Sequence, residues 1–465
     1  MAERNVDVLV VGACTAGLYF AGLMARQGYK VLVCDKAAEE KLGTEYHIIH
    51  IGQEHFKRFG LHEPRPGDPE YVASFDLAIL RSALNNWPKK TRASVLVLRR
   101  GALVGRLAAW AREQGAELLC DTAFERPVFD EGGRLAGAVL RRETGGTSGA
   151  AAGADGEITV KARLCADASG IPAVLRTSLP PDYGMETFVT GKRDQFYVVL
   201  HYVNLKHPEK DKTEITTTWP HYKTWLAPQH ETKGAIMGVG ANLSFEYAER
   251  CFQRFAARGY LPEYEPDHIE QGSTPYRRPP YSFVAGGFVA LGSAACISNP
   301  WSGEGVPYGW LLCSIAAEEC GRAMKDGAYP AAESIWAVNI RYIREQGALF
   351  AKNLAMLCGA TRCSPEENDY EFRHSIIYED ADEKNRGGLA GKLLRGLLSG
   401  GLSPAALGGL IGAAGIGEKV YKHYLAFPAA PAGLASWAAR ADKIWRKAGS
   451  MADAAEKDLA AMGAS

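Results

Sequence analysis

One turn near the start of the chain has residue types that could hold a phosphate group. Gly12-Ala13-Cys14-Thr15-Ala16-Gly17 has the spacing G-x-G-x-x-G, with Cys14 in place of the middle glycine. Small residues are needed there because backbone amides and a helix N-terminus must approach a pyrophosphate closely. Asp35 ends the next predicted strand, where an acid can accept hydrogen bonds from both ribose hydroxyls. We therefore expect a dinucleotide to bind Gly12, Ala13, Cys14, Ala16, Gly17, Asp35 and the adjacent Lys36.

A second segment, Tyr46-His47-Ile48-Ile49-His50, could deliver a proton to a substrate. Imidazole titrates near neutral pH, which makes His47 and His50 candidates for that role. The same pattern also fits a strand in which the two histidines simply face opposite sides. We keep His50 and His47 as candidate catalytic residues, with this structural alternative beside them.

The elements that must position the phosphate turn form a strand-helix-strand unit. Residues 6–11 are nearly all apolar and mostly β-branched, which is typical of a strand buried on both faces of a parallel sheet. Residues 16–27 predict a helix that Gly28 closes, and residues 30–34 predict the next strand. Residues 94–98, 103–114 and 116–120 predict a similar strand-helix-strand unit. The fold class expected from these units is α/β.

Three later segments decide which dinucleotide binds. Arg99-Arg100-Gly101 opens a helix, Asp167-Ala168-Ser169-Gly170 follows a strand, and Gly292-Ser293 leads to Asn299-Pro300-Trp301-Ser302-Gly303-Glu304-Gly305-Val306. Together with the first turn they resemble the p-hydroxybenzoate hydroxylase superfamily of FAD proteins, and more closely its geranylgeranyl reductase family. The resemblance covers roughly residues 5–325.

The resemblance implies FAD as the cofactor, with flavin N5 as the hydride donor. In the family, the segment matching residues 292–306 presents helix-terminal amides to the flavin, and such a helix N-terminus would stabilise the negative charge of reduced flavin. Ser293 stands where the family has an acid that holds the ribityl chain, so a neutral hydroxyl would replace a charged partner. The implied cofactor contacts beyond the first turn are Arg100, Ala123, Asp167, Gly170, Gly292, Ser293, Pro300, Gly303, Gly305 and Val306.

A further segment resembles the floor of the family's substrate cavity. Trp225-Leu226-Ala227-Pro228 is similar to the pattern aromatic-x-Trp-x-Phe-Pro, with Ala227 in place of the usual Phe, which would widen the cavity. Aromatic side chains supply contact area without a charge, so we expect them to be walls and not catalysts. The expected cavity residues are Tyr222, Trp225, Pro228, Trp301 and Cys296.

The resemblance and the strand patterns together predict three parts. A Rossmann-like FAD-binding domain would comprise residues 1–70, 95–184 and 276–330. An inserted antiparallel β-sheet substrate domain would comprise residues 71–94 and 185–275, where aromatic and β-branched residues alternate. Residues 331–465 would form a helical C-terminal region.

Composition restricts the partners of the protein. The formal net charge of the 465 residues is zero, so we expect no nucleic acid. The ten cysteines show no C-x-x-C spacing, and the N-terminus leads directly into the first strand, so we expect reduced thiols and a cytoplasmic protein without a metal site. Residues 389–425 are rich in Gly and Leu and carry Lys392 and Arg395. They predict a packed helical layer or a peripheral contact with a membrane.

Three functions remain open on the sequence alone. The first is an FAD-dependent reductase of C=C bonds in a hydrophobic isoprenoid or lipid-like substrate. The second is an aromatic monooxygenase or halogenase of the same superfamily, and the third is a flavin-free binding protein, which Cys14 and Ser293 suggest. No second G-x-G-x-x-G turn for a nicotinamide is present, so NAD(P)H, ferredoxin and a quinol all remain candidate electron donors.

Overall fold

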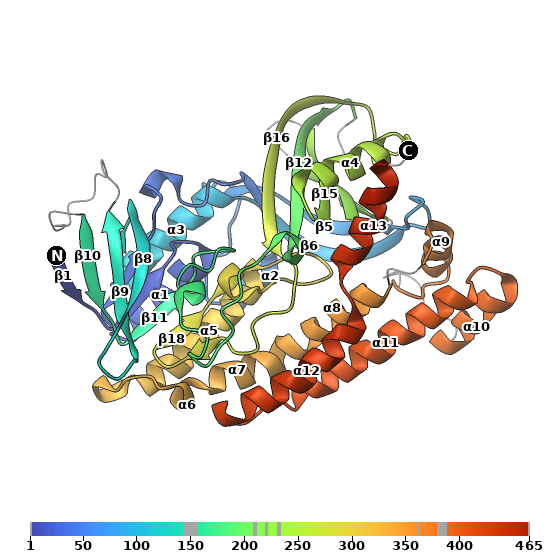
Figure 1. The fold of residues 1–465 in the computed structure, drawn as a ribbon. Helices are drawn as coiled ribbons and strands as arrows, with labels where there is room; N and C mark the ends of the chain where they lie inside the picture. Colours follow the sequence, from blue (N-terminus) through green and yellow to red (C-terminus); the bar gives the residue numbers. More distant parts are fainter. Residues whose placement is uncertain are drawn as a thin grey trace.

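The chain folds into three β-sheets and a layer of C-terminal helices (Figure 1). The computed structural model describes residues 2–142, 156–207, 212–218, 222–229, 234–360, 363–378 and 388–463.

A six-stranded sheet forms the centre of the nucleotide-binding part. Its order is β17-β18-β11-β2-β3-β7, and every neighbouring pair is parallel except β17 with β18. The strands are β2 (Val8–Val11), β3 (Val31–Cys34), β7 (Glu117–Leu119), β11 (Leu164–Asp167), β17 (Val284–Ala285) and β18 (Phe288–Ala290). Helix α1 (Thr15–Arg26) packs between α3 (Arg100–Glu113) and α5 (Val306–Ala323). The predicted Rossmann-like α/β architecture is confirmed.

A smaller sheet lies beside the parallel sheet, at the N-terminal end of the molecule in Figure 1. Its order is β1-β10-β9-β8. The strands are β1 (Ala2–Asn5), β8 (Thr122–Phe129), β9 (Leu135–Arg142) and β10 (Glu157–Lys161).

The third sheet has eight strands in the order β16-β12-β15-β14-β13-β5-β6-β4. They are β4 (Ile48–Gly52), β5 (Tyr71–Arg81), β6 (Lys89–Arg99), β12 (Gln195–Leu205), β13 (Lys212–Thr218), β14 (Tyr222–Gln229), β15 (Gly234–Asn242) and β16 (Tyr264–Pro275). The sheet is curled, and its two edge strands β4 and β16 come close to each other. The His47 amide, just before β4, donates to Glu270 Oε2 of β16 at 2.9 Å.

The two faces of this curved sheet have different surroundings. Helix α4 (Phe245–Ala256) covers the outer face, and α13 (Met451–Gly463) also contacts it. The opposite face, called the inner face here, buries a cluster that includes Ile48, Phe75 and Leu200. The curl brings β4, β5 and β6 from one half of the sheet and β12 and β15 from the other half into that one cluster.

One strand belongs to a different sheet than its sequence pattern predicts. Residues 95–98 fall in the segment 95–184 that we assign to the nucleotide-binding domain, whereas β6 runs antiparallel between β5 and β4 in the eight-stranded sheet. The strand-helix-strand order is correct, but a local pattern does not determine which neighbours a strand pairs with. Strand β4 lies within the segment 1–70 that we assign to the nucleotide-binding domain, but it pairs with β6 in the eight-stranded sheet. The domain boundaries stay a prediction.

The C-terminal region is helical, as expected. A π-helical turn over Ile343–Gly347 joins α7 to α8, and α8 packs along α11. The helices are α6 (Ala332–Ile335), α7 (Ala337–Tyr342), α8 (Ala348–Ala360), α9 (Pro365–Arg373), α10 (Leu389–Ser399), α11 (Pro404–Leu425) and α12 (Leu434–Ala448). None of the helices in the described part of the chain is long and apolar enough to cross a membrane.

Candidate active site

The turn after β2 has a backbone that only glycine fits. Gly12 has a φ of +108°, and a Cβ there would lie 2.3 Å from the Ala168 carbonyl oxygen. A Cβ on Gly17 would lie 2.0 Å from the Gly12 carbonyl oxygen. Both glycines therefore allow the first turn of α1 to pack against β2 and β11, which directs the N-terminus of α1 toward the end of the parallel sheet.

Cys14 replaces the middle glycine without blocking the start of the helix. Its Sγ accepts from the Gly17 amide at 3.5 Å and donates to the Ala168 carbonyl oxygen at 3.2 Å. Burial raises the pKa of the Cys14 thiol, so the group is neutral at pH 7. Because the thiol is held by these two protein partners, it caps α1 in the way that Ser or Asp does elsewhere.

Asp35 lies beside this turn. Its Oδ2 accepts from the Ala13 amide at 2.7 Å, and its Oδ1 accepts from the Ala37 amide at 2.8 Å. An ionised carboxylate has about four acceptor positions, so two remain for ribose hydroxyls. The start of β8 lies alongside, since the Thr122 amide donates to the Asp35 carbonyl oxygen at 2.8 Å, which brings Ala123 to the same end of the sheet. Lys36 is exposed.

Arg100, the first residue of α3, completes this group. Its guanidinium lies 4.4 Å from the centre of the Tyr46 ring and forms an ion pair with Glu45. It is also close enough to Cys14 for its charge to oppose the effect of burial on the pKa of that thiol. The structure therefore brings together a helix N-terminus, a carboxylate and a cation that the sequence separates widely.

Asp167 holds the turn that follows β11. It is fully buried; Oδ1 accepts from the Ser169 amide and hydroxyl, and Oδ2 accepts from the Arg176 amide. Burial raises the pKa of this carboxyl. Because Asp167 is fully buried and three donors of the protein itself bind its oxygens, it fixes the turn at Gly170, and a contact with the cofactor stays a prediction.

The segment from Gly292 to Val306 approaches the first turn from the other side. A Cβ on Gly292 would lie 2.9 Å from the Ala16 Cβ, so these two residues are in contact across the sheet end. Gly305 is the N-cap of α5, and Gly303 has a φ of +82° with no neighbour within 4 Å of an added Cβ. The N-termini of α1 and α5 thus lie at the same end of the parallel sheet.

The loop before α5 is tied to the eight-stranded sheet. The Tyr276 hydroxyl, just after β16, donates to the Pro300 carbonyl oxygen, and Ser298 Oγ donates to the Pro275 carbonyl oxygen at 2.6 Å. Trp301 is half-buried, and its ring lies edge-on to Tyr378 at 6.3 Å. Half-buried Ser293 and Val306 border the same loop. This loop is therefore where the parallel sheet, the curved sheet and the C-terminal region meet.

Cys296 does not line an open cavity, contrary to our expectation. It is 2% exposed, and its Sγ lies 3.8 Å from Thr190 Oγ1. Its φ of +53° turns the chain sharply after residues 292–295. Burial raises the pKa of the thiol, and the residue fills space in the core.

His47 and His50 point to different surroundings, as the structural alternative proposed. His47 is exposed, just before β4. His50 lies on the inner face with its ring 5.8 Å from Phe75, and its buried Nε2 has no hydrogen-bond partner in the described part of the chain. Burial lowers the pKa of His50 to about 4, so the imidazole is neutral at pH 7. His50 therefore does not hold an imidazolium proton ready for a substrate.

Strand β14 divides the expected cavity residues between the two faces of the sheet. Trp225 pairs with Gly238 of β15, and its indole lies where a Cβ on Gly238 would be, at 1.9 Å, on the inner face. Tyr222 is 1% exposed on the outer face, packed with α4. Pro228 shares that outer face by the strand alternation. Trp225 is thus a wall of the inner face. Tyr222 and Pro228 each lie three residues from Trp225 along the strand, so their side chains point to the outer face.

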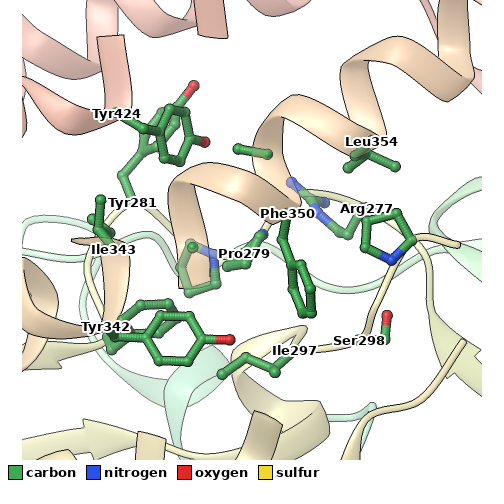
Figure 2. A pocket seen from close by; sticks show the side chains of 15 residues that line it. Arg277, Pro279, Tyr281, Ile297, Ser298, Tyr342, Ile343, Phe350, Leu354 and Tyr424 are labelled. Carbon is green, nitrogen blue, oxygen red and sulfur yellow. The ribbon is translucent and has the colours of Figure 1, made fainter. Parts of the chain in front are cut away.

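A narrow apolar cavity of about 30 Å³ lies behind the loop before α5, a feature that no sequence signal indicated. Figure 2 shows Phe350 projecting from the C-terminal helices toward Ile297, with Tyr342 and Pro279 beside it. The lining is almost wholly apolar, and Arg277 is the charged residue at its edge. This side of the loop is packed against the C-terminal helices, and the cavity is too small for a lipid substrate.

Glu304 lies in the loop before α5 and was not among the predicted site residues. It is half-buried, and its Oε2 accepts from Ser302 Oγ at 3.0 Å. Burial raises the pKa of this carboxyl. Its position between Gly303 and Gly305, directly before α5, was a signal that we could have used. Among the described residues, no group of His, Cys, Asp and Glu has the arrangement of a metal site.

Comparison with known proteins agrees with this geometry. No protein-family profile matches the chain. The digeranylgeranylglycerophospholipid reductase of Sulfolobus acidocaldarius is 24% identical over 463 residues, which span 96% of this chain and 98% of that protein. The protein of the same name from Methanospirillum hungatei is 25% identical and covers 70% of this chain and 78% of its own length. This chain is similar to those reductases over most of its length. The resemblance predicted from its motifs is confirmed.

Solved structures give the same fold. A geranylgeranyl bacteriochlorophyll reductase-like protein from Thermoplasma acidophilum superposes with a TM-score of 0.71 at 15% identity, covering 82% of this chain and 94% of that one. A myxobacterial FAD-dependent chondrochloren halogenase superposes with a TM-score of 0.60 at 16% identity, covering 88% of this chain and 97% of that one. This chain thus has the fold of FAD-dependent oxidoreductases.

Proposed function

We propose that this chain is an FAD-dependent reductase of C=C bonds in an isoprenoid lipid. The observation that carries the proposal is the match to digeranylgeranylglycerophospholipid reductase along 96% of the chain. The reductase-like protein from Thermoplasma also has a higher TM-score than the halogenase. The inner face of the curved sheet is apolar, which suits a hydrocarbon chain.

The donor set of the site fits FAD. The amides at the N-terminus of α1 and the Arg100 guanidinium would hold the pyrophosphate, and Asp35 would hold the ribose. The N-terminus of α5 would lie at the flavin, where its dipole stabilises an anion. When bound there, the reduced flavin supplies a hydride to the substrate.

The protein's own residues would control water and the proton. Trp225, Leu200 and Ile236 make the inner face apolar, so a double bond held there is shielded from bulk water. Glu304 lies beside Gly305, the N-cap of α5, where the flavin would lie, and burial raises the pKa of its carboxyl, whereas burial keeps His50 neutral at neutral pH. We therefore propose Glu304 in place of His47 and His50 as the group that supplies the proton.

The experiment that tests this function separates the reductase from its alternatives. The protein is purified without added cofactor, any chromophore is released by denaturation and identified, and the reloaded enzyme is reduced with NADPH, ferredoxin or a quinol in parallel. A reductase passes electrons to a geranylgeranyl lipid without oxygen. A monooxygenase or halogenase consumes oxygen in proportion to product, and a protein that takes up no FAD is the flavin-free binder.

A peripheral contact with a membrane is also part of the proposal. Leu394, Leu398 and Ile411 of α10 and α11 are 56, 77 and 58% exposed, and residues 388–417 contain no acidic side chain. Helices α10 and α11 project together at one end of the molecule in Figure 1. Such a surface can insert into a bilayer, from which a lipid substrate must be taken. Of the two cations expected there, Arg395 is exposed, whereas Lys392 is buried and donates to the Ser375 carbonyl oxygen.

Vesicle flotation tests the membrane contact. We expect the protein to float with vesicles of phosphatidylcholine and phosphatidylglycerol, and Leu394→Asp with Leu398→Asp to abolish flotation. Val189→Asp changes an equally exposed apolar residue away from these helices and serves as the control. Flotation of the double variant equal to that of the wild type would contradict the contact.

A further inference from the structure

The inner face of the sheet carries a cation beside Trp225. Lys223 of β14 pairs with Gly240 of β15, just as Trp225 pairs with Gly238. Residues two apart on a strand point to the same side, so Lys223 and Trp225 project from the same face. Val198, which pairs with Gly240 from β12, packs against the apolar cluster of that face. The lysine therefore enters the space that we assign to the substrate.

Two glycines of β15 face these side chains, and aromatic rings lie over both of them. A Cβ on Gly238 would lie 1.9 Å from the Trp225 indole, and a Cβ on Gly240 would lie 2.1 Å from the Phe196 ring. The neighbouring strand therefore presents no side chain of its own opposite Lys223, and aromatic rings border the position. A flexible lysine in that place can reach a ligand that lies along the face.

Lys223 has no countercharge within the described part of the chain. No hydrogen bond or ion pair joins it to another described residue, and burial is the sole cause that lowers its pKa, to about 8. At pH 7 the Lys223 amine is still mostly protonated and therefore carries a positive charge. A half-buried cation without a partner costs free energy of folding, and such groups are typical of binding sites.

Ala227 extends this arrangement along β14. It lies two residues beyond Trp225, on the same side of the strand as Lys223. Ala227 pairs with Ile236, a residue of the inner-face cluster, so all three positions share the inner face. Lys223 and Ala227 thus place one cation and one small methyl group on either side of Trp225, on a face that is otherwise lined by apolar side chains.

We propose that Lys223 binds an anionic group of the substrate, a phosphate or a carboxylate, while the hydrocarbon chain lies against Trp225. The inference rests on the proposed function and narrows its substrate to an isoprenoid amphiphile that carries an anion. The ammonium would fix the depth at which the chain enters and thereby select which double bond reaches the flavin. Lys223 is in this sense a residue that determines specificity, not one that transfers a proton or hydride.

Equilibrium binding to the oxidised, FAD-loaded enzyme tests this directly. Isothermal titration compares geranylgeranyl phosphate, geranylgeranoic acid and the neutral geranylgeraniol in the wild type, Lys223→Met and Lys223→Arg. A charge-assisted contact corresponds to about a 10- to 100-fold effect on Kd. We expect Lys223→Met to weaken one or both anions by that factor, to leave the alcohol within about twofold, and Lys223→Arg to restore most of the loss. Lys192→Met, an exposed lysine, is the matched control.

The outcomes separate this inference from the proposed function. Selective weakening of the phosphate identifies a phosphate site, and selective weakening of the acid identifies a carboxylate site. Equal weakening of all three ligands by Lys223→Met, or no change for any anion, overturns the inference even if the lipids are reduced. Binding that depends on Lys223 but no reduction of any of them keeps the anion site and refutes the reductase.

Discussion

The two ends of the candidate site are built from different parts of the chain. At the parallel sheet, the turn at Gly12 and the start of α5 offer backbone amides, and their shape depends on glycines at fixed spacings. On the curved sheet, the site is made by side chains such as Trp225 and Lys223, and their placement depends on strand register. Backbone sites are determined locally, whereas side-chain sites require the whole sheet to form. This difference explains which end tolerates which substitution.

The largest effect is expected at the backbone end. Gly12→Val places a Cβ 2.3 Å from the Ala168 carbonyl oxygen at a φ of +108°, so the turn must open. We expect a loss of at least about 3 kcal/mol in the free energy of unfolding, together with the bound flavin. Thermal unfolding and flavin absorbance measure both. Gly105→Ala in α3, which meets no atom within 4 Å, should change stability by no more than about 1 kcal/mol. Retention of FAD by Gly12→Val would contradict the backbone account.

A pH-dependent effect is expected on the inner face. The pKa of His50 is about 4 in the folded protein and about 6.5 when unfolded, so the unfolded chain binds more protons between these values. The free energy of unfolding should therefore rise with pH through that window, by about 3 kcal/mol from this residue, and be lost as pH falls. Urea unfolding at about pH 7.5 and pH 4.5 should show His50→Gln with that much less pH dependence. Exposed His207→Gln is the control; an unchanged slope in His50→Gln would refute the burial of His50.

A smaller and coupled effect is expected where the Trp225 indole covers Gly238. Gly238→Ala displaces the indole and should lower kcat/KM for an isoprenoid lipid by about tenfold. In a Trp225→Ala background the same change should have less than about a twofold further effect, because the displaced group is already absent. Steady-state kinetics of the four proteins give the coupling. Gly105→Ala in α3, which meets no atom within 4 Å, is the control, and additive effects would show that the two residues act separately.

The smallest effect is a gain at the backbone end. Ser293→Asp introduces the acid that the resembled family uses at this position. A charged acceptor in place of a neutral hydroxyl should increase FAD affinity by about fivefold, about 1 kcal/mol. Titration of the cofactor-free protein with FAD measures this, and Ser399→Asp on the surface controls for net charge. Weaker binding by Ser293→Asp would show that Ser293 does not face the ribityl chain.

The sequence predicts the backbone end closely because its signals are local. The spacing of Gly12 and Gly17, the acid Asp35 and the loop before α5 each encode their own turn. The curved sheet was predicted as a strand-rich region, but not its register. An odd or even separation on β14 decides that Trp225 faces inward and Tyr222 outward, and that parity is assigned only when neighbouring strands pair. The buried positions of Cys296 and Lys392 likewise depend on contacts with distant segments.

The central claim is that reduced flavin in this protein saturates C=C bonds of an isoprenoid lipid. The most direct test is a single turnover without oxygen, in which photoreduced, FAD-loaded enzyme is mixed with a geranylgeranyl phospholipid. Flavin absorbance and the product mass are followed together. We expect the flavin to be reoxidised while one double bond per flavin gains two hydrogen atoms. Flavin that stays reduced until oxygen is admitted, followed by a product that contains an added oxygen atom, would contradict it.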